Sequence, residues 1–475
     1  MTSTPRFKSL VAPNIFDAYA DPNLLLYLVA SNLLSPATWE LSRKIQGRVA
    51  QEAEAGQPSS RSLIAEIQKL LDRNFQHLHV AQVVDLYGEI DLAEERSRLG
   101  DDEVDAALRL ILGTFEARIR SGDIPPEALQ PAIDRIGEGH FPAYVYGNID
   151  LVRANRRLTG KSHASVRGVT SCVDETAIFA ALAMTMPRGA IAHIVALSSP
   201  SHTSAFGWSG DGEPWWFYGK NRLYFAEDWR RWVSQSHAGD AQQAFDRLHA
   251  DMNRIISAAG TFDLETAETN LPDDQFNEIV AKMESFFGVR LRQVETALSR
   301  PWIRQPEDPL ARYLRLLLGA PSLEDVHRML GDATGEAPQG VLYAFRPTST
   351  IDTQPCLAVA RDQPNARRLA GTLSTIEDAL AVLASIDDTT SIFGSRGRIA
   401  MPDETLRFRS GTDRDKALLL HVLAEHLAAR VGLPGPIVTL FADSRSFVRL
   451  GDRYADAGSG ELMREISEPI LVELA

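Results

Sequence analysis

The sequence predicts an α+β protein: a small core with a β-sheet, helical regions on either side of it, and a C-terminal α/β domain. Three observations support this prediction. Between residues 14 and 140, apolar residues recur at three- and four-residue spacing, which is typical of amphipathic helices. Residues 168–221 have the pattern of one helix, one strand and a β-hairpin. From about residue 308, helical patterns are followed by strand-like runs. The expected regions are a helical N-terminal region (1–140), a core (141–225), a second helical region (226–305) and the C-terminal α/β domain (306–475).

Periodicity places the elements outside the core. The dense apolar run at 23–30 predicts a buried helix, and the four prolines between 123 and 142 indicate a connection into the core. The acidic stretch 261–273 is expected to be a loop. Further helices are expected over 62–77, 101–121, 226–236, 241–259, 274–287, 310–318 and 323–330, and strands over 340–345 and 356–360.

Composition limits the classes of function. The net charge is −14, from 49 basic and 63 acidic residues, which argues against nucleic-acid binding because phosphate contacts need clustered Lys and Arg. Two cysteines, Cys172 and Cys356, cannot build a disulfide framework and favour a reducing compartment. Neither a signal peptide nor an apolar run of membrane-spanning length is visible. We therefore expect a cytoplasmic protein with no membrane partner.

Cys172 is the candidate nucleophile. Ser171 followed three residues later by Asp174 is a helix-capping signature, so Cys172 is expected at the first helical position. Unpaired N–H groups at a helix start favour a thiolate, the form that attacks carbonyls. Asp174 and Glu175 oppose this, so a nearby cation is needed. The basic segment 154–168 is one source, although a solvated loop is the favoured explanation of that segment.

The hairpin supplies a base and an orienting group. Asp211-Gly212 is a strong two-residue turn signal centred at 211.5, and His202 and Asn221 are equidistant from it. In that register the two residues face each other across an antiparallel pair. If their face packs on the helix start, Cys172, His202 and Asn221 form a nucleophile, a base and an orienting group. Separately, each has an ordinary explanation: a buried thiol, a capped histidine and a strand-end asparagine.

These features resemble the transglutaminase-like core of papain-like cysteine enzymes. The shared features are a cysteine at the start of a small-residue helix, the strand motif PRGAIAHIV (187–195), and a histidine and a polar residue on adjacent strands. The resemblance covers roughly residues 140–225. It implies acyl transfer on an amide or thioester carbonyl of a peptide, protein or small molecule. Most such cores carry Asp as the third member, whereas Asn221 stands here, as Asn does in papain-like peptidases.

Several further expectations accompany this resemblance. Such cores usually have a tryptophan upstream of the cysteine, which is missing here, so the Cys172 backbone N–H is the expected oxyanion donor. No nucleotide, zinc or dinucleotide motif is found, so neither a metal nor a cofactor is expected. Three tryptophans around the hairpin are expected to pack in the core or to stack on substrate: Trp208, Trp215 and Trp216.

Residues 411–457 resemble the same core a second time. Asp413 stands where a cysteine would be, and the hairpin that follows lacks its histidine. This pattern predicts a degenerate, catalytically inactive copy, although an ordinary amphipathic helix followed by two strands would look similar. It also supports a second hypothesis for the whole chain, a non-catalytic transglutaminase-like scaffold that binds a peptide or protein partner.

Overall fold

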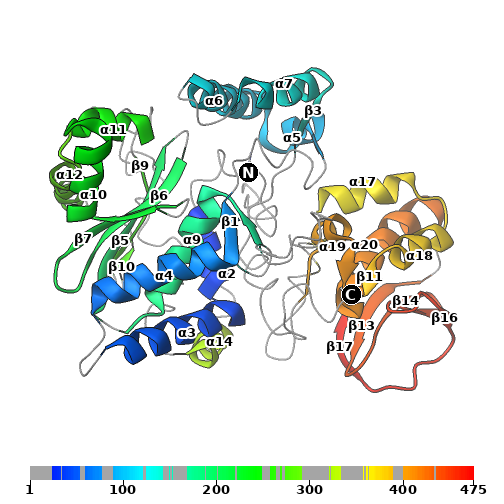
Figure 1. Cartoon of the computed structure of the whole chain (residues 1–475). Helices are drawn as coiled ribbons and strands as arrows, with labels where there is room; N and C mark the ends of the chain where they lie inside the picture. The colour runs from blue at the N-terminus through cyan, green and yellow to red at the C-terminus, as the bar shows by residue number, and fades with distance from the viewer. Residues whose placement is uncertain are drawn as a thin grey trace. The chain divides into compact units, whose positions relative to one another are not determined.

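The structure is a computed structural model of the whole chain. It describes residues 16, 24–33, 35–53, 59–77, 89–120, 125–142, 149, 152, 168–187, 189–199, 202–219, 222–248, 257–263, 268–269, 273–290, 320, 322–332, 357, 360–361, 363–388, 399–432 and 435–475. The described chain forms two compact units, which we call the core unit (Pro13–Met329) and the C-terminal unit (within Leu330–Ala475). Both contain helices and antiparallel sheet, so the α+β class is confirmed (Figure 1).

The core unit is built on a six-stranded antiparallel sheet with strand order β10-β9-β5-β6-β7-β8. Its middle strands, β5 to β7, are consecutive in the chain, which is the arrangement expected of short hairpin connections. In chain order the strands are β5 (Ile191–Ser199), β6 (His202–Ser209), β7 (Pro214–Gly219), β8 (Arg222–Phe225), β9 (Ser257–Asp263) and β10 (Glu268–Thr269).

Helices cover both faces of this sheet. On one face, Phe179 of α9 (Cys172–Met184) stacks on Phe217 and contacts Trp215 of β7. On the other, Trp216 packs against Phe287 of α12 (Asp273–Phe287). Helices α10 (Ala226–His237) and α11 (Ala241–Leu248) lie on that second side as well (Figure 1). Because both faces are covered, β6 and β7 are buried along almost their whole length instead of alternating between buried and exposed residues.

Helix α9 is buried on all sides. The side chains from Ala177 to Ala183 are at most 1% exposed, which fits a helix with apolar residues around its whole circumference. Opposite the sheet it packs against α2 (Leu24–Leu33), α3 (Pro36–Glu52) and α4 (Ser60–Asn74). Strand β4 (Gly168–Thr170) leads directly into α9 and pairs in parallel with β1 (Phe75–His77). The start of α9 is therefore fixed by a strand that follows α4.

The predicted hairpin register was wrong by one residue. The turn has three loop residues, Gly210 to Gly212, because Gly212 takes a left-handed conformation (φ 85°) and its N–H donates to the Ser209 carbonyl at 2.8 Å. The ladder runs from Ala205↔Phe217 to Trp208↔Pro214, which centres it on residue 211 and not on 211.5. This register does not place residue 221 directly opposite His202. Asn221 itself lies outside the described residues.

Elsewhere the helices agree better with the sequence than the strands do. The helices expected over 226–236 and 274–287 match α10 and α12 closely. The helix expected over 241–259 ends at Leu248, and β9 follows within a stretch predicted as helix and loop. Its Ser-Ala-Ala-Gly sequence has little intrinsic strand preference, so pairing with β5 is what makes it a strand. Further elements of this unit are β2 (Glu89–Asp91), α5 (Leu92–Leu99), α6 (Asp101–Arg120), η3 (Pro126–Ala128), α7 (Gln130–Gly137) and β3 (His140–Pro142), and α14 (Leu323–Asp332) reaches the unit boundary.

The C-terminal unit has a five-stranded antiparallel sheet with strand order β16-β15-β14-β13-β17. Its longest helix, α20 (Asp413–Val431), packs on this sheet and carries three shorter helices on its other side (Figure 1). The remaining elements are α17 (Pro364–Thr372), α18 (Ile376–Ala384), β11 (Asp387–Asp388), α19 (Pro402–Phe408), β12 (Ser410–Gly411), β13 (Ile437–Ala442), β14 (Ser446–Leu450), β15 (Arg453–Asp456), β16 (Leu462–Met463) and β17 (Ile470–Leu474).

The two units share one order of elements. In each, a helix is followed by a short strand that pairs in parallel with a second short strand, and this second strand leads into a buried helix, α9 or α20. Three consecutive antiparallel strands come next: β5, β6 and β7 in the core unit, and β13, β14 and β15 in the C-terminal unit. A later strand, β9 or β17, pairs beside the first of the three. Corresponding positions in the two units can therefore be compared.

Candidate active site

Cys172 lies at the first position of α9, as the capping signature predicted. The N-cap residue Ser171 accepts a hydrogen bond from the Asp174 backbone N–H at 3.5 Å, and the Asp174 carboxylate accepts from the Ser171 N–H at 2.8 Å. This reciprocal capping box defines where the helix begins. Cys172 is a partly exposed residue and is not in a disulfide.

His202 is the first residue of β6 and is buried, with 3% of its surface exposed. Its Nε2 lies 2.6 Å from the backbone carbonyl oxygen of Tyr218. Because a carbonyl can only accept, Nε2 must carry the proton of this hydrogen bond, and in the neutral ring the lone pair is then on Nδ1. A hydrogen bond to a backbone carbonyl thus fixes the orientation of this ring.

The beginnings of α9 and β6 meet in the structure. Thr176, one turn into the helix, donates a hydrogen bond from Oγ1 to the carbonyl oxygen of Thr203 at 3.2 Å. Thr203 is the residue that follows His202. The contact brings the end of α9 that carries Cys172 to the end of β6 that carries His202.

The sequence left open which hairpin face packs on α9. Helix α9 contacts the sheet face formed by Phe217 and Trp215. By strand alternation His202 belongs to the opposite face, together with Ser204, which accepts a hydrogen bond from Trp216 Nε1 at 3.2 Å. The His202 ring lies at the end of the sheet, where its centroid is 4.4 Å from that of Tyr218 and 6.4 Å from that of His77.

His77 and Glu175 complete this cluster and were not identified from the sequence as a pair. Nδ1 of His77 lies 3.0 Å from Oε2 of Glu175, and both side chains are less than a tenth exposed. Thr170 Oγ1 donates to the other carboxylate oxygen at 2.9 Å. A Cβ added to Gly219 would stand 2.7 Å from Oε2, so the glycine provides room for the carboxylate. No local pattern relates His77 to Cys172, because the pairing of β1 with β4 joins distant parts of the chain.

Two of the three predicted substrate-binding tryptophans belong to the core. Trp215 and Trp216 are completely buried, since neighbouring residues of β7 point to opposite faces of a sheet that is covered on both sides. The proposal that they stack on substrate was therefore wrong. Trp208 is partly exposed, but it lies six residues along β6 from His202, roughly 20 Å away at about 3.3 Å per residue.

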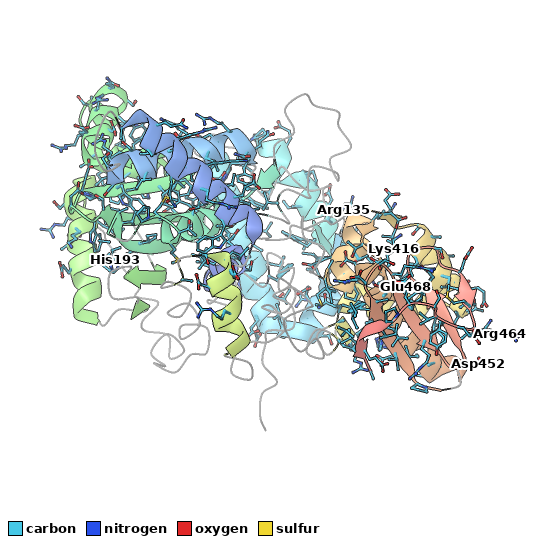
Figure 2. The ribbon with its side chains drawn as sticks, turned by 90° about the horizontal axis from the view of Figure 1, so that it is seen from below. Arg135, His193, Lys416, Asp452, Arg464 and Glu468 are labelled. Atoms are coloured by element: carbon cyan, nitrogen blue, oxygen red, sulfur yellow. The ribbon has the colours of Figure 1, made fainter. Side chains whose placement is uncertain are left out.

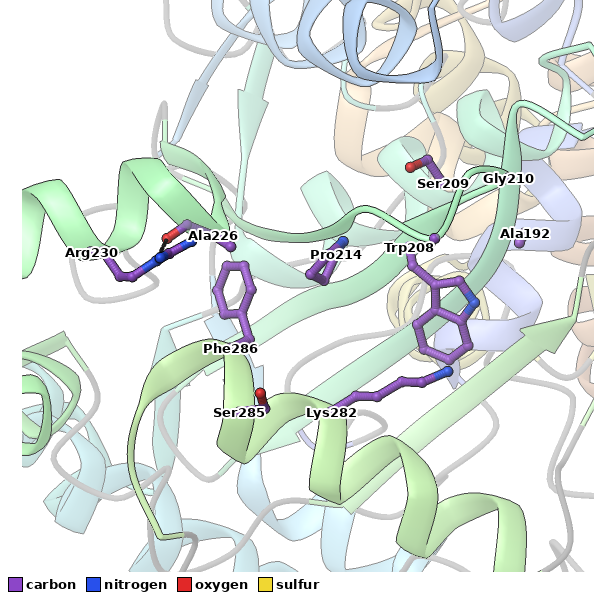
Figure 3. Close-up of a pocket in the computed structure, with 11 residues that line it drawn as sticks. Ala192, Trp208, Ser209, Gly210, Pro214, Ala226, Arg230, Lys282, Ser285 and Phe286 are labelled. Atoms are coloured by element: carbon purple, nitrogen blue, oxygen red, sulfur yellow. Dashed lines mark hydrogen bonds between the residues drawn. The ribbon is translucent and has the colours of Figure 1, made fainter.

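Trp208 instead lines a separate pocket of about 680 Å³ (Figure 3). Its indole stacks on His193 with a centroid distance of 4.4 Å, and the Lys282 ammonium lies 4.0 Å from its ring centre. His193 is buried in this stack. The pocket lies between the hairpin turn and helices α10 and α12, and it is lined by Ala192, Trp208, Ser209, Gly210, Gly212, Pro214, Ala226, Arg230, Lys282, Ser285 and Phe286.

The corresponding end of the C-terminal unit has the same framework with different side chains. Asp413 is the first residue of α20 and accepts a hydrogen bond from Oγ of Ser446, the first residue of β14, at 2.7 Å. Lys416, at the fourth helical position like Glu175, pairs with Asp388 of β11 at 2.6 Å (Lys416 is labelled in Figure 2). Asp388 pairs with Gly411, two residues before α20, just as His77 pairs with Thr170, two residues before α9.

Within the ranges that the structure describes, no group of three or more His, Cys, Asp or Glu side chains is arranged to hold a metal ion, and no helix is long and apolar enough to cross a membrane. Cys356, like Asn221, lies outside the described residues. Comparison of the chain with protein-family models, with curated proteins and with solved structures gives no match.

Proposed function

We propose that the protein is a thiol-dependent acyl-transfer enzyme with Cys172 as nucleophile and His202 as base. The observation that carries the proposal is the meeting of the two element ends, through the 3.2 Å bond from Thr176 to Thr203. A thiol at a helix start and an imidazole held on one nitrogen are the two groups that such a reaction needs. The order of helix, strand and hairpin also resembles a transglutaminase-like core.

The reaction would proceed in two balanced steps. In the first, the Sγ proton passes to Nδ1 of His202, sulfur bonds to the substrate carbonyl carbon, and the imidazolium returns the proton to the departing amine or thiol. In the second, water gives a proton to the imidazole and attacks the thioester, and the C–S bond breaks to restore the thiol. Backbone N–H groups of the first turn of α9 would stabilise the oxyanion. We favour water over an amine as acceptor because water needs no second binding site.

The Tyr218 carbonyl takes over part of the role first given to Asn221. A hydrogen bond from Nε2 to this carbonyl holds the ring orientation and the tautomer without a third side chain. A carbonyl carries no full charge, so it stabilises an imidazolium less than a carboxylate does. We therefore expect Asn221→Ala to reduce turnover only moderately, whereas His202→Ala removes the base.

We also propose that the C-terminal unit is a second, inactive copy of this core. The shared order of elements and the matching positions of Asp413 and Cys172 support it. Asp413 and Ser446 cannot act as thiolate and base, so this copy would serve in binding or in structure.

Alkylation kinetics test the proposal without a known substrate. The full chain is treated with iodoacetamide at pH 7, and labelling of Cys172 and Cys356 is followed by peptide mass spectrometry. We expect Cys172 to react much faster than Cys356 and to react more slowly in His202→Ala. Equal, slow labelling of both cysteines, unchanged by His202→Ala, would contradict an enzyme and favour the non-catalytic scaffold. Gln76→Ala, which changes an exposed neighbour of His77, is a matched surface control.

A further inference from the structure

We propose that His77 is a positioning residue of this site: its ring contacts the buried Glu175 carboxylate, so that its protonated form offsets this charge and thereby favours the thiolate of Cys172. The inference rests on the proposed function, because it concerns the nucleophile of that reaction. It goes beyond it by assigning a role to a side chain on β1, a strand outside the helix and hairpin that carry the reacting groups.

The helix places Glu175 beside the thiol. Cys172 and Glu175 are three residues apart in the first turn of α9, and residues at this spacing share one helix face. A carboxylate there opposes the formation of a thiolate by charge repulsion. Burial strengthens the effect, since the Glu175 side chain is only 7% exposed.

The carboxylate cannot easily turn away from the thiol. Its two oxygens contact different groups, Nδ1 of His77 at 3.0 Å and Oγ1 of Thr170 at 2.9 Å. The backbone at Gly219 closes the remaining side, where a Cβ would lie 2.7 Å from Oε2. The carboxylate is thus held in place, and a cation in contact with it reduces its effect on the thiol.

The charged and titratable groups around His77 come from several elements. Glu175 and Cys172 belong to α9, and the His202 ring on β6 lies 6.4 Å away. Arg222 of β8 lies over the Tyr218 ring at 5.6 Å. The Asp174 carboxylate is engaged in the capping box by Ser171. Among these, His77 is the group in direct contact with the Glu175 charge.

The C-terminal unit has the opposite charges at the corresponding positions, with its acidic partner 79% exposed. Lys416 and Asp388 occupy the positions of Glu175 and His77 and form an ion pair at 2.6 Å. In both units a buried charge at the fourth helical position is matched by a partner from the short parallel strand. The exchange His77→Asp with Glu175→Lys would therefore keep a neutral pair while placing the positive end beside Cys172.

Three variants give the test, with Cys172 alkylation by iodoacetamide measured from pH 5.5 to pH 8.5. His77→Gln removes the ring that contacts the Glu175 carboxylate, and we expect labelling at pH 6.5 to slow by roughly tenfold, because a nearby carboxylate opposes thiolate formation. In the exchanged pair, the double variant His77→Asp with Glu175→Lys, Cys172 should be labelled at least as fast as in the wild type. Glu175→Gln should also not slow labelling, because it removes the opposing charge. Asp388→Asn in the C-terminal unit is the matched control and should leave the rate unchanged.

The inference is supported if His77→Gln slows Cys172 labelling and the exchanged pair does not. A purely structural role of His77 would instead give both variants the same labelling behaviour, either slowed or unchanged. Equal rates in all variants, or equal slowing by all three, would overturn it. Circular dichroism verifies that each variant is folded, and if the exchanged pair does not fold, the contrast between His77→Gln and Glu175→Gln decides. If His202→Ala slows labelling and the His77 variants do not, this inference fails and the proposed function stands. If His202→Ala has no effect, the proposed function fails whatever the His77 variants do.

Discussion

Asp415 provides a quantitative test of the C-terminal unit. This residue is the third of α20, and its carboxylate accepts hydrogen bonds from the backbone N–H groups of Thr412 at 2.8 Å and Ala400 at 2.6 Å. It is 2% exposed. Burial raises the pKa of Asp415 from 3.8 to about 6, because the cost of removing its charge from water exceeds the stabilisation by these hydrogen bonds.

The sign and size of the pH effect follow from this value. The folded state holds the Asp415 proton up to about pH 6, whereas the unfolded chain releases it near pH 3.8, so the folded state binds more protons between these values. The contribution of Asp415 to the free energy of unfolding is therefore fully present below pH 3.8 and is lost as the pH rises through about 6. A pKa difference of about 2 corresponds to about 3 kcal/mol of unfolding free energy.

Comparison with Asp415→Asn isolates this effect. Glu425 has its pKa lowered to about 2, with burial opposed by hydrogen bonds from His421 and Arg361, and it produces the opposite slope in both proteins. Subtracting the two stability curves removes that slope. The wild type should lose about 2 kcal/mol relative to Asp415→Asn between pH 4 and pH 7, because part of the effect already falls below pH 4.

The stability of the C-terminal unit is measured by urea denaturation, with hydrogen exchange of α20 peptides as the readout. All seven tryptophans precede residue 330, so their fluorescence reports only the core unit and provides an internal control. The wild type and Asp415→Asn should have the same fluorescence transition at every pH. A stability difference in α20 that does not change with pH, or one that favours the wild type as pH rises, would refute the reasoning.

Three further predictions concern the core unit. Gly219→Ala should destabilise the core unit by about 1–2 kcal/mol in urea titrations, because the φ of Gly219 is +80°. The new Cβ should also displace the Glu175 carboxylate and so change the rate of Cys172 alkylation. An unchanged rate would contradict the close contact between residue 219 and Glu175. Trp216→Ala should cost about 3–5 kcal/mol, since it empties a completely buried site, and a urea midpoint like that of the wild type would contradict its place in the core. Arg61→Gln should lower the free energy of unfolding by less than about 1 kcal/mol, and high salt should remove that difference. The reason is that the Arg61 side chain, which pairs with Glu213 of the hairpin at 2.6 Å, is 38% exposed. A large loss of stability that does not depend on salt would contradict this.

The helix start could be predicted because its signal is local. Ser171 and Asp174 are three residues apart, and their reciprocal hydrogen bonds form within one turn, so the sequence placed Cys172 at the first helical position correctly. The same reasoning failed for the hairpin, although its signal is also local. Gly210 joined the turn and lengthened the loop by one residue, and a shift of one residue reverses which face each side chain occupies.

The remaining parts of the site depend on pairing between distant segments. His77 reaches Glu175 only because β1 pairs with β4, and the residues between these strands contain no pattern that predicts the pairing. The burial of Trp215 and Trp216 likewise required knowing that helices cover both faces of the sheet. The sequence by itself determined the helix that presents Cys172, because capping acts within one turn. Only the tertiary structure decided which groups surround the thiol, because strand pairing and two-sided packing join residues far apart in the chain.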